Sequence, residues 1–272
     1  MSKTGVPVLD MPLDHPRPVV RCFEGRKMSF HIPGEETSAL KALALEQDTT
    51  LYTVLLAAYI ILLGKLSGQD DIVVGLTTAG RRRVDLEAVI GNFITTLAAR
   101  FRLDRDKTFI DFLRRVKEYT LEVFQNQDYP FENLVRKVAG QKDPGRNPLF
   151  DVMFGLLNME RTDQPGEIPG DEPGGFTLET YEYDNKRSRV DLLLLGREEG
   201  DGINFSAEYS TALFKEETVR AFTRYYRQII SHILEEPGEK IKDIELVSAE
   251  EKDKILSAIR EDEHNMEIEF EI

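Results

Sequence analysis

The run of apolar residues from Val54 to Leu63 constrains the fold more than any other stretch of the chain. Thr50 stands just before it at a typical N-cap position, so the sequence predicts a helix that ends at about Leu66. A helix that is apolar nearly all round has to be covered on every side. The run is too short to span a bilayer. The sequence therefore predicts a central helix inside a globular core and no membrane-spanning segment.

The rest of the pattern mixes strands with helices and lacks the regular alternation of a βαβ fold. Further helices are predicted over about 35–48, 108–127, 130–139 and 214–234, with Thr108 as a cap and Pro130 at a helix start. Strands are predicted over about 71–77, 93–103, 149–157, 176–183, 189–195 and 203–209, with a turn at 200–202 and a hairpin over 19–32 that turns at Glu24-Gly25-Arg26. This pattern favours an α/β sandwich with a mixed or antiparallel sheet.

Composition narrows the classes of partner. The chain of 272 residues carries a formal net charge of -14, which repels phosphate backbones and anionic membranes, so we expect no nucleic-acid partner. No apolar signal segment is visible in residues 1–18. The single cysteine, Cys22, lies in the strand-like stretch Val19–Phe23 and is expected to be a buried structural thiol. A reducing, cytoplasmic location fits these features.

The proline-rich residues 1–18 are expected to form a linker or a crossing segment against the domain wall. Residues 19–247 are expected to form one domain, in which 160–175 are a Pro- and Gly-rich surface loop. Residues 248–272 are expected to be an acidic exit linker or tail. Its last stretch, 266–272, alternates apolar and acidic residues, which fits a strand and a frayed end equally well.

The usual signatures of self-contained catalysis are absent from the sequence. It has no Gly-rich phosphate loop, no Cys/His cluster with metal-ligand spacing and no Gly-x-Ser-x-Gly nucleophile turn. Its four histidines, His15, His31, His232 and His264, are isolated from one another and are expected to be structural or solvated. No catalytic residue, resident cofactor or metal site is therefore predicted.

Three ordered blocks carry a resemblance instead. Ile90–Arg100, Asn126–Glu132 and Arg146–Phe154 resemble the fifth, sixth and seventh motifs of the condensation domains of nonribosomal peptide synthetases. The sixth block has no departure from the family pattern. Thr95 replaces the usual asparagine of the fifth, and Lys142 replaces the usual arginine just before the seventh.

Similarity to this family extends over nearly the whole chain. Val74–Arg81 resembles the strand and turn that precede the fifth motif. The resemblance begins at Asp14-His15-Pro16-Arg17-Pro18 and reaches Leu246-Val247-Ser248, which looks like the exit toward an adenylation domain. It implies the chloramphenicol acetyltransferase-like fold, in which two subdomains form a V around the active site.

The resemblance also implies what this chain lacks. In the family, a His-His-x-x-x-Asp-Gly motif in the N-terminal half serves catalysis, and no such pair of histidines occurs here. We therefore interpret the chain as the C-terminal subdomain, noncatalytic by itself. Paired with an N-terminal half, it would help form amide bonds between aminoacyl or peptidyl thioesters. The expected partners are that half, an adenylation domain, and upstream and downstream peptidyl carrier proteins with phosphopantetheine arms.

The resemblance implies roles for those residues of this chain that match the family motifs. Arg81 is expected to form a salt bridge with the aspartate of the missing motif, or else to lie in a solvated basic loop with Arg82 and Arg83. Asn147 is a candidate for polar contact with the substrate or a pantetheine arm. The residues expected to shape the tunnel or hold the subdomains are Gly75, Asn92, Phe93, Thr96, Asp128, Pro130, Phe131, Asn147 and Pro148.

Simpler interpretations of the same residues remain open. Phe93 and Thr96 fit core and sheet positions, the start of the 130–139 helix fits a hydrophobic staple, and Asn147-Pro148 fits a turn. At the level of function, the alternatives are a noncatalytic module that docks carrier proteins, an epimerisation or ester-forming relative of the same fold, and a plain structural α/β domain.

Overall fold

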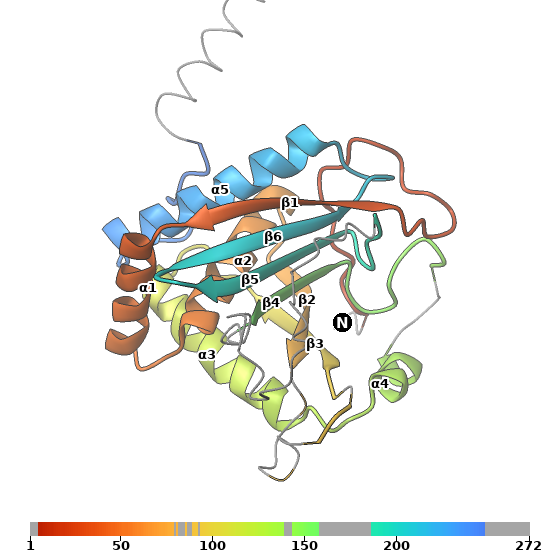
Figure 1. Ribbon diagram of the computed structural model, residues 1–272, viewed down its shortest axis with the longest axis horizontal. Helices are drawn as coiled ribbons and strands as arrows, with labels where there is room; N and C mark the ends of the chain where they lie inside the picture. Colours follow the sequence, from red (N-terminus) through yellow and green to blue (C-terminus); the bar gives the residue numbers. More distant parts are fainter. Residues whose placement is uncertain are drawn as a thin grey trace, which may run out of the picture.

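The computed structural model describes residues 5–78, 80, 85, 89–91, 93–138, 143–157 and 186–247. Within these residues the chain forms one six-stranded sheet with the strand order β1-β6-β5-β4-β2-β3 (Figure 1). The strands are β1 Gly25–Ile32, β2 Asp71–Thr78, β3 Thr95–Arg102, β4 Val152–Leu157, β5 Leu192–Glu199 and β6 Gly202–Ser210. The helices are α1 Gly34–Glu46, α2 Leu51–Ser67, α3 Phe109–Gln125, α4 Phe131–Val138 and α5 Glu216–Glu235.

The sheet is mixed, as predicted. Its centre is parallel: β4 runs parallel to β2, with Val152 opposite Val74, and parallel to β5, with Val152 opposite Leu192. The outer pairs β2–β3, β5–β6 and β1–β6 are antiparallel. The α/β sandwich expected from the sequence is therefore confirmed.

Helix α2 is the central helix that the apolar run predicts. The Thr50 side chain accepts a hydrogen bond from the Thr53 backbone N–H at 3.2 Å, which caps the first turn. Gly68 ends the helix in the left-handed conformation at φ 69°. Every residue from Thr53 to Gly64 is buried, because α1, α3, α5 and the sheet surround the helix.

A chain of aromatic rings joins the helix layer to the sheet. The ring of Phe154 on β4 lies 5.5 Å from Tyr52 and 5.6 Å from Tyr59. Tyr59 in turn meets Tyr226 of α5, which packs edge-on against Phe205 of β6 at 5.6 Å. The Tyr226 hydroxyl donates to a backbone carbonyl of α2 at 3.0 Å. These contacts align α2 and α5 on the same face of the sheet (Figure 1).

The N-terminal segment 5–23, which we call the crossing segment, is packed into the domain. Leu9 and Met11 belong to the main hydrophobic core. Asp14 accepts hydrogen bonds from the Lys215 backbone N–H at 2.8 Å and from the Thr218 hydroxyl at 2.9 Å, so it caps α5 from a distant part of the chain.

Two predictions around residues 19–32 are wrong. No hairpin forms there, because β1 pairs along its whole length with β6, from Gly25 opposite Ser210 to Ile32 opposite Ile203. The residues before Glu24 are outside any strand. Cys22 is a free, half-buried thiol in this irregular stretch, so it is not the buried strand residue that the sequence favoured.

Some expectations fall outside the described residues. They include the loop at 160–175, the strand at 176–183 and the tail at 248–272. No single described helix is long and apolar enough to cross a membrane; α1 and α2 pass that test only together, by length and composition, across a bend of 102°.

Candidate functional site

The three sequence blocks meet around strand β2. The fifth block supplies β3, which pairs with β2 so that Thr96 lies opposite Thr77. The seventh block supplies β4 on the other side of β2. From the sixth block, the side-chain oxygen of Gln127 accepts a hydrogen bond from the Thr78 hydroxyl at 3.0 Å. Segments far apart in the sequence thus form one continuous region.

Gly75 allows the close packing at the middle of this region. A Cβ atom at that position would lie 2.6 Å from Cε2 of Phe150 and 2.7 Å from Cγ of Met153. The Phe150 ring also meets the ring of Phe131 at 5.8 Å, which fixes α4 beside the sheet. Gly75, Phe131 and Phe150 therefore form a packing unit that joins the sixth and seventh blocks to β2.

Asp128 and Pro130, which are expected to shape the tunnel or hold the subdomains, lie in the turn between α3 and α4. The Pro130 carbonyl accepts hydrogen bonds from the backbone N–H groups of Asn133 at 3.0 Å and Leu134 at 3.1 Å, so it starts α4. Asp128 and Pro130 are both exposed. Their placement agrees with the simpler interpretation as a helix start and leaves their surfaces accessible.

Asn147 and Pro148 form a turn before β4. The Asn147 side-chain oxygen accepts a hydrogen bond from the Leu149 backbone N–H at 3.2 Å, which is an Asx turn. Asn147 is half-buried and Pro148 is exposed. The turn interpretation is thus observed, and a substrate contact by Asn147 remains a proposal.

The loop between β2 and β3 is described only in part. Arg81 and Asn92 lie outside the described residues, so their expected roles stay predictions. Phe93 is half-buried, and its carbonyl oxygen would be 2.0 Å from a Cβ placed on Gly80. Gly80 also has φ 65°. Both facts demand glycine where the backbone turns after β2.

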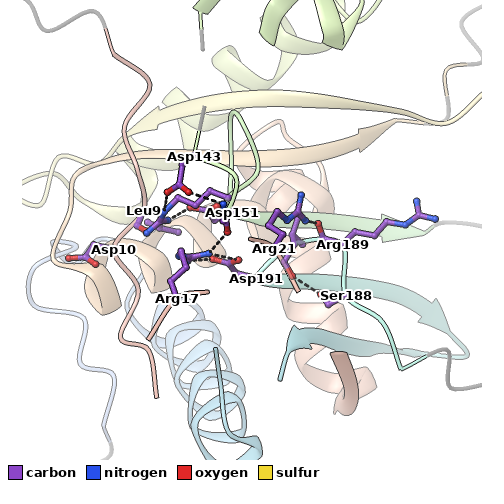
Figure 2. A network of polar contacts seen from close by, with 12 residues as sticks. Leu9, Asp10, Arg17, Arg21, Asp143, Asp151, Ser188, Arg189 and Asp191 are labelled. Atoms are coloured by element: carbon purple, nitrogen blue, oxygen red, sulfur yellow. Dashed lines mark hydrogen bonds and ion pairs between the residues drawn. The ribbon is translucent and has the colours of Figure 1, made fainter. Parts of the chain in front are cut away.

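Sequence reasoning missed a cluster of ion pairs at the strand starts (Figure 2). Asp151 and Asp191 stand one residue before the parallel strands β4 and β5, and the Asp191 N–H donates to the Asp151 carbonyl at 2.8 Å. Arg17 of the crossing segment binds both carboxylate oxygens of Asp191. Arg146 of the seventh block binds Asp151. All four side chains are at most 17% exposed.

The electrostatics of this cluster follow from its burial. Burial raises the pKa of Asp151, and the carboxylate of Asp191 raises it further, against the opposing effects of Arg146 and Arg17. For Arg17, burial alone would lower the pKa, but the hydrogen-bonded Asp191 carboxylate raises it above its usual range. Such buried pairs are costly to break because one charge would stay behind uncompensated.

Arg100, the last residue of the fifth block, has a visible structural role. Its Nε and Nη2 donate to the two oxygens of Asp71 at 2.8 and 2.7 Å. This bidentate pair links β3 to β2 near one end of the sheet. Hydrogen bonding from Arg100 holds the pKa of Asp71 below its usual value.

The described histidines occupy separate places. His31 on β1 is hydrogen-bonded to Asn204 at 2.6 Å, His232 of α5 is paired with Glu239, and His15 lies in the crossing segment. His264 is outside the described residues. Within the part of the chain that the structure describes, no three His, Cys, Asp or Glu side chains are grouped as metal ligands.

Comparison with known proteins agrees with this geometry. The sequence matches the family model described as "Condensation domain" over residues 2–256. The chain belongs to the condensation-domain family. It is 41% identical to surfactin synthase subunit 1 of Bacillus subtilis (strain 168) over 253 residues, and 43% identical to gramicidin S synthase 2 of Brevibacillus brevis over 251 residues. These matches cover 93% and 92% of this chain but only 7% and 6% of those synthetases.

Solved structures show the same fold. A four-domain nonribosomal peptide synthetase, holo-AB3403 bound to AMP and glycine, matches 91% of this chain with a TM-score of 0.80 and 24% identity, over 19% of its own length. The X-domain from teicoplanin biosynthesis matches 89% of this chain with a TM-score of 0.75 and 23% identity, over 54% of its length. The chain thus combines membership of the condensation-domain family with the chloramphenicol acetyltransferase-like fold of these structures.

Proposed function

We propose that this chain is the C-terminal half of a condensation domain, which forms an amide bond only together with an N-terminal half. The convergence of the three family blocks around β2 is the observation that carries this proposal. The coverage of a solved X-domain chain supports it, since this chain matches 54% of that chain. The separation of the described histidines supports a noncatalytic role for this half.

The proposed reaction is acyl transfer between two carrier-bound thioesters. The amine of the acceptor attacks the donor carbonyl carbon, a C–N bond forms, the C–S bond breaks, and the donor pantetheine leaves as a thiol. A histidine of the N-terminal half would accept the amine proton or position the amine. Phosphopantetheine arms of the carrier proteins would deliver both substrates, so this chain would bind no resident cofactor.

This chain would supply one wall of the tunnel. Gly75, Phe131 and the turn at Asn147-Pro148 would shape that wall, together with Asn92, Phe93 and Thr96 of the fifth block. Arg81 would pair with the aspartate of the histidine motif across the interface. A guanidinium buried there without that partner would be costly, so Arg81 would also favour association of the two halves.

The proposed partners follow from the same assignment. They are an N-terminal condensation half, two peptidyl carrier proteins and an adenylation domain after Leu246–Ser248, in a cytoplasmic synthetase. The second candidate is a noncatalytic docking module, which the scattered positions of His15, His31 and His232 favour for this chain by itself. Epimerisation or ester formation on the same fold is a third candidate.

A single-turnover assay tests the proposal. Aminoacyl-loaded donor and acceptor carriers are incubated with this chain, with a separately produced N-terminal half, and with both, and the peptidyl product is quantified by mass spectrometry. Product in the mixture alone is expected. Product from this chain by itself would contradict the noncatalytic assignment, and no product from the mixture would favour the docking module. Replacing the amine acceptor by a hydroxyl acceptor, and measuring the configuration of the donor residue, separates the other reactions.

A further inference from the structure

The crossing segment and the loop before the seventh block lie directly against each other. The Arg21 backbone N–H donates to the Pro144 carbonyl at 3.0 Å. A Cβ atom on Gly145 would be 2.5 Å from the Pro18 carbonyl oxygen, so only glycine permits this approach. Arg146 reaches back from the loop to the Leu9 carbonyl at 3.3 Å. The contact therefore extends along most of the crossing segment.

Arg17 is the centre of this contact. One guanidinium nitrogen donates to Asp191 Oδ1 at 3.0 Å and also lies 3.4 Å from the Gly145 carbonyl, while the other binds Asp191 Oδ2. The side chain thus connects the crossing segment to the start of β5 and to the loop before Asn147 at once (Figure 2). The planar guanidinium binds the Asp191 carboxylate through two parallel hydrogen bonds, so it fixes the orientation of the two groups as well as their distance. A lysine ammonium would not fix the orientation.

The backbone around Arg17 is built to be stiff. Pro16 and Pro18 flank it, and each proline ring restricts its own φ angle. The residue before a proline is also confined to extended conformations. The backbone that carries Arg17 is therefore restricted in conformation. Its partner Asp191 lies directly before β5, a central strand of the sheet.

We propose that Arg17 is a positioning residue that, through Asp191 and Gly145, holds the 143–148 loop, and with it Asn147 and Pro148, in the geometry that the condensation reaction requires. This proposal rests on the proposed function for its catalytic consequence. Its structural part concerns this chain alone: the crossing segment and the loop move as one unit, and the ion pair couples them.

Three variants separate positioning from stability. Arg17→Lys keeps the charge opposite Asp191 but loses the bidentate fork. The double variant Arg17→Met/Asp191→Leu removes both buried charges together, which is the change that leaves stability least affected. Gly145→Ala leaves every charge in place and pushes the loop away from Pro18. Arg227→Met is the control, because it breaks an ion pair between α5 and α1 on another side of the fold.

The first readout is hydrogen exchange on this chain by itself. Loss of protection by about fivefold or more is expected at the amides of Arg21, Gly145 and Arg146 in all three test variants, with strand β6 unchanged. The control should match the wild type. Unchanged loop protection in Arg17→Lys and Gly145→Ala, the two variants that keep the buried charges balanced, would overturn the proposal whatever the double variant does.

The second readout is the single-turnover rate in the mixture with the N-terminal half. About a tenfold loss is expected in the test variants, with a thermal midpoint close to that of the wild type for Arg17→Lys. If Arg17→Met/Asp191→Leu has both the thermal midpoint and the single-turnover rate of the wild type, the ion pair is only structural. That result would overturn the positioning role of Arg17. Absence of product with the wild-type chain would instead defeat the proposed function, while hydrogen exchange would still decide the coupling.

Discussion

The two faces of the sheet are stabilised by different means. On the helix face, the rings of Phe154, Tyr59 and Tyr226 and the aliphatic residues of α2 form an apolar core. On the other face, a small cluster around Phe150 packs against Gly75, and buried ion pairs lie beside it. The seventh block contributes to both faces, since Phe154 lies in the apolar core while Phe150 and the Arg146–Asp151 ion pair lie on the other face. The helix face therefore depends on general apolar packing, and the opposite face depends on tight packing and directional polar contacts.

The helix face should lose the most stability when one ring is removed. Phe154→Ala deletes the ring that joins Tyr52 to Tyr59, and we expect a loss of about 3–5 kcal/mol in the free energy of unfolding. Urea denaturation followed by circular dichroism measures it. A loss below about 1 kcal/mol would mean that the core there is loosely packed.

The opposite face should be sensitive to one added methyl group. Gly75→Ala places a carbon against Phe150 and Met153, and we expect a cost of about 1–3 kcal/mol. Phe150→Leu in the same chain should relieve part of that clash, so the two substitutions should not be additive in a double-mutant cycle. Additive costs would show that Gly75 is not in tight contact with Phe150.

The cap that the crossing segment gives to α5 should have an intermediate effect. Asp14→Ala removes the acceptor for Lys215 N–H and Thr218, and a loss of about 1 kcal/mol is expected from chemical denaturation. Asp14→Asn is the matched control, because its amide oxygen can still accept a hydrogen bond and should recover part of the loss. Equal stability of Asp14→Ala and the wild type would refute the cap.

The smallest effect is expected at the edge pair of Asp71 and Arg100. Hydrogen bonding lowers the pKa of Asp71 in the folded state, so its stabilisation is present above the unfolded pKa and is lost as the pH falls through the folded pKa. Both side chains are over a third exposed, so the contribution is at most about 1 kcal/mol. Wild type and Asp71→Asn should therefore differ in stability at pH 6, and the difference should shrink as the pH falls below the ordinary pKa of an aspartate. If the stability difference between the wild type and Asp71→Asn grew as the pH fell, the predicted direction of the pH dependence would be wrong.

Local signals made much of the fold predictable. The threonine caps at Thr50 and Thr108, the apolar run of α2 and the Gly200–Gly202 turn all act over a few residues. The five predicted helices, and the predicted strands among the described residues apart from the hairpin, formed within about four residues of their expected ends. The predicted hairpin at 19–32 failed because β1 finds its partner in β6, far along the chain. Periodicity indicates a strand but not the strand beside it.

The site was predictable only where a family pattern existed. The resemblance drew attention to Gly75, Phe131 and Asn147, which lie in β2, at the start of α4 and in the turn before β4, while their functional roles stay predictions. Arg17 and Asp191 were missed, because a contact between residues 174 positions apart leaves no mark in spacing or composition. One usable signal was an aspartate directly before each of two buried apolar strands, since a charge there needs a partner.

The central claim is that this chain provides a wall and not the catalytic base. The most direct test replaces all four of its histidines, His15, His31, His232 and His264, by glutamine and repeats the single-turnover assay with the N-terminal half. We expect product at the wild-type rate, once the folded fraction is matched by circular dichroism. Loss of product from a folded quadruple variant would contradict the noncatalytic assignment and place a catalytic histidine in this chain.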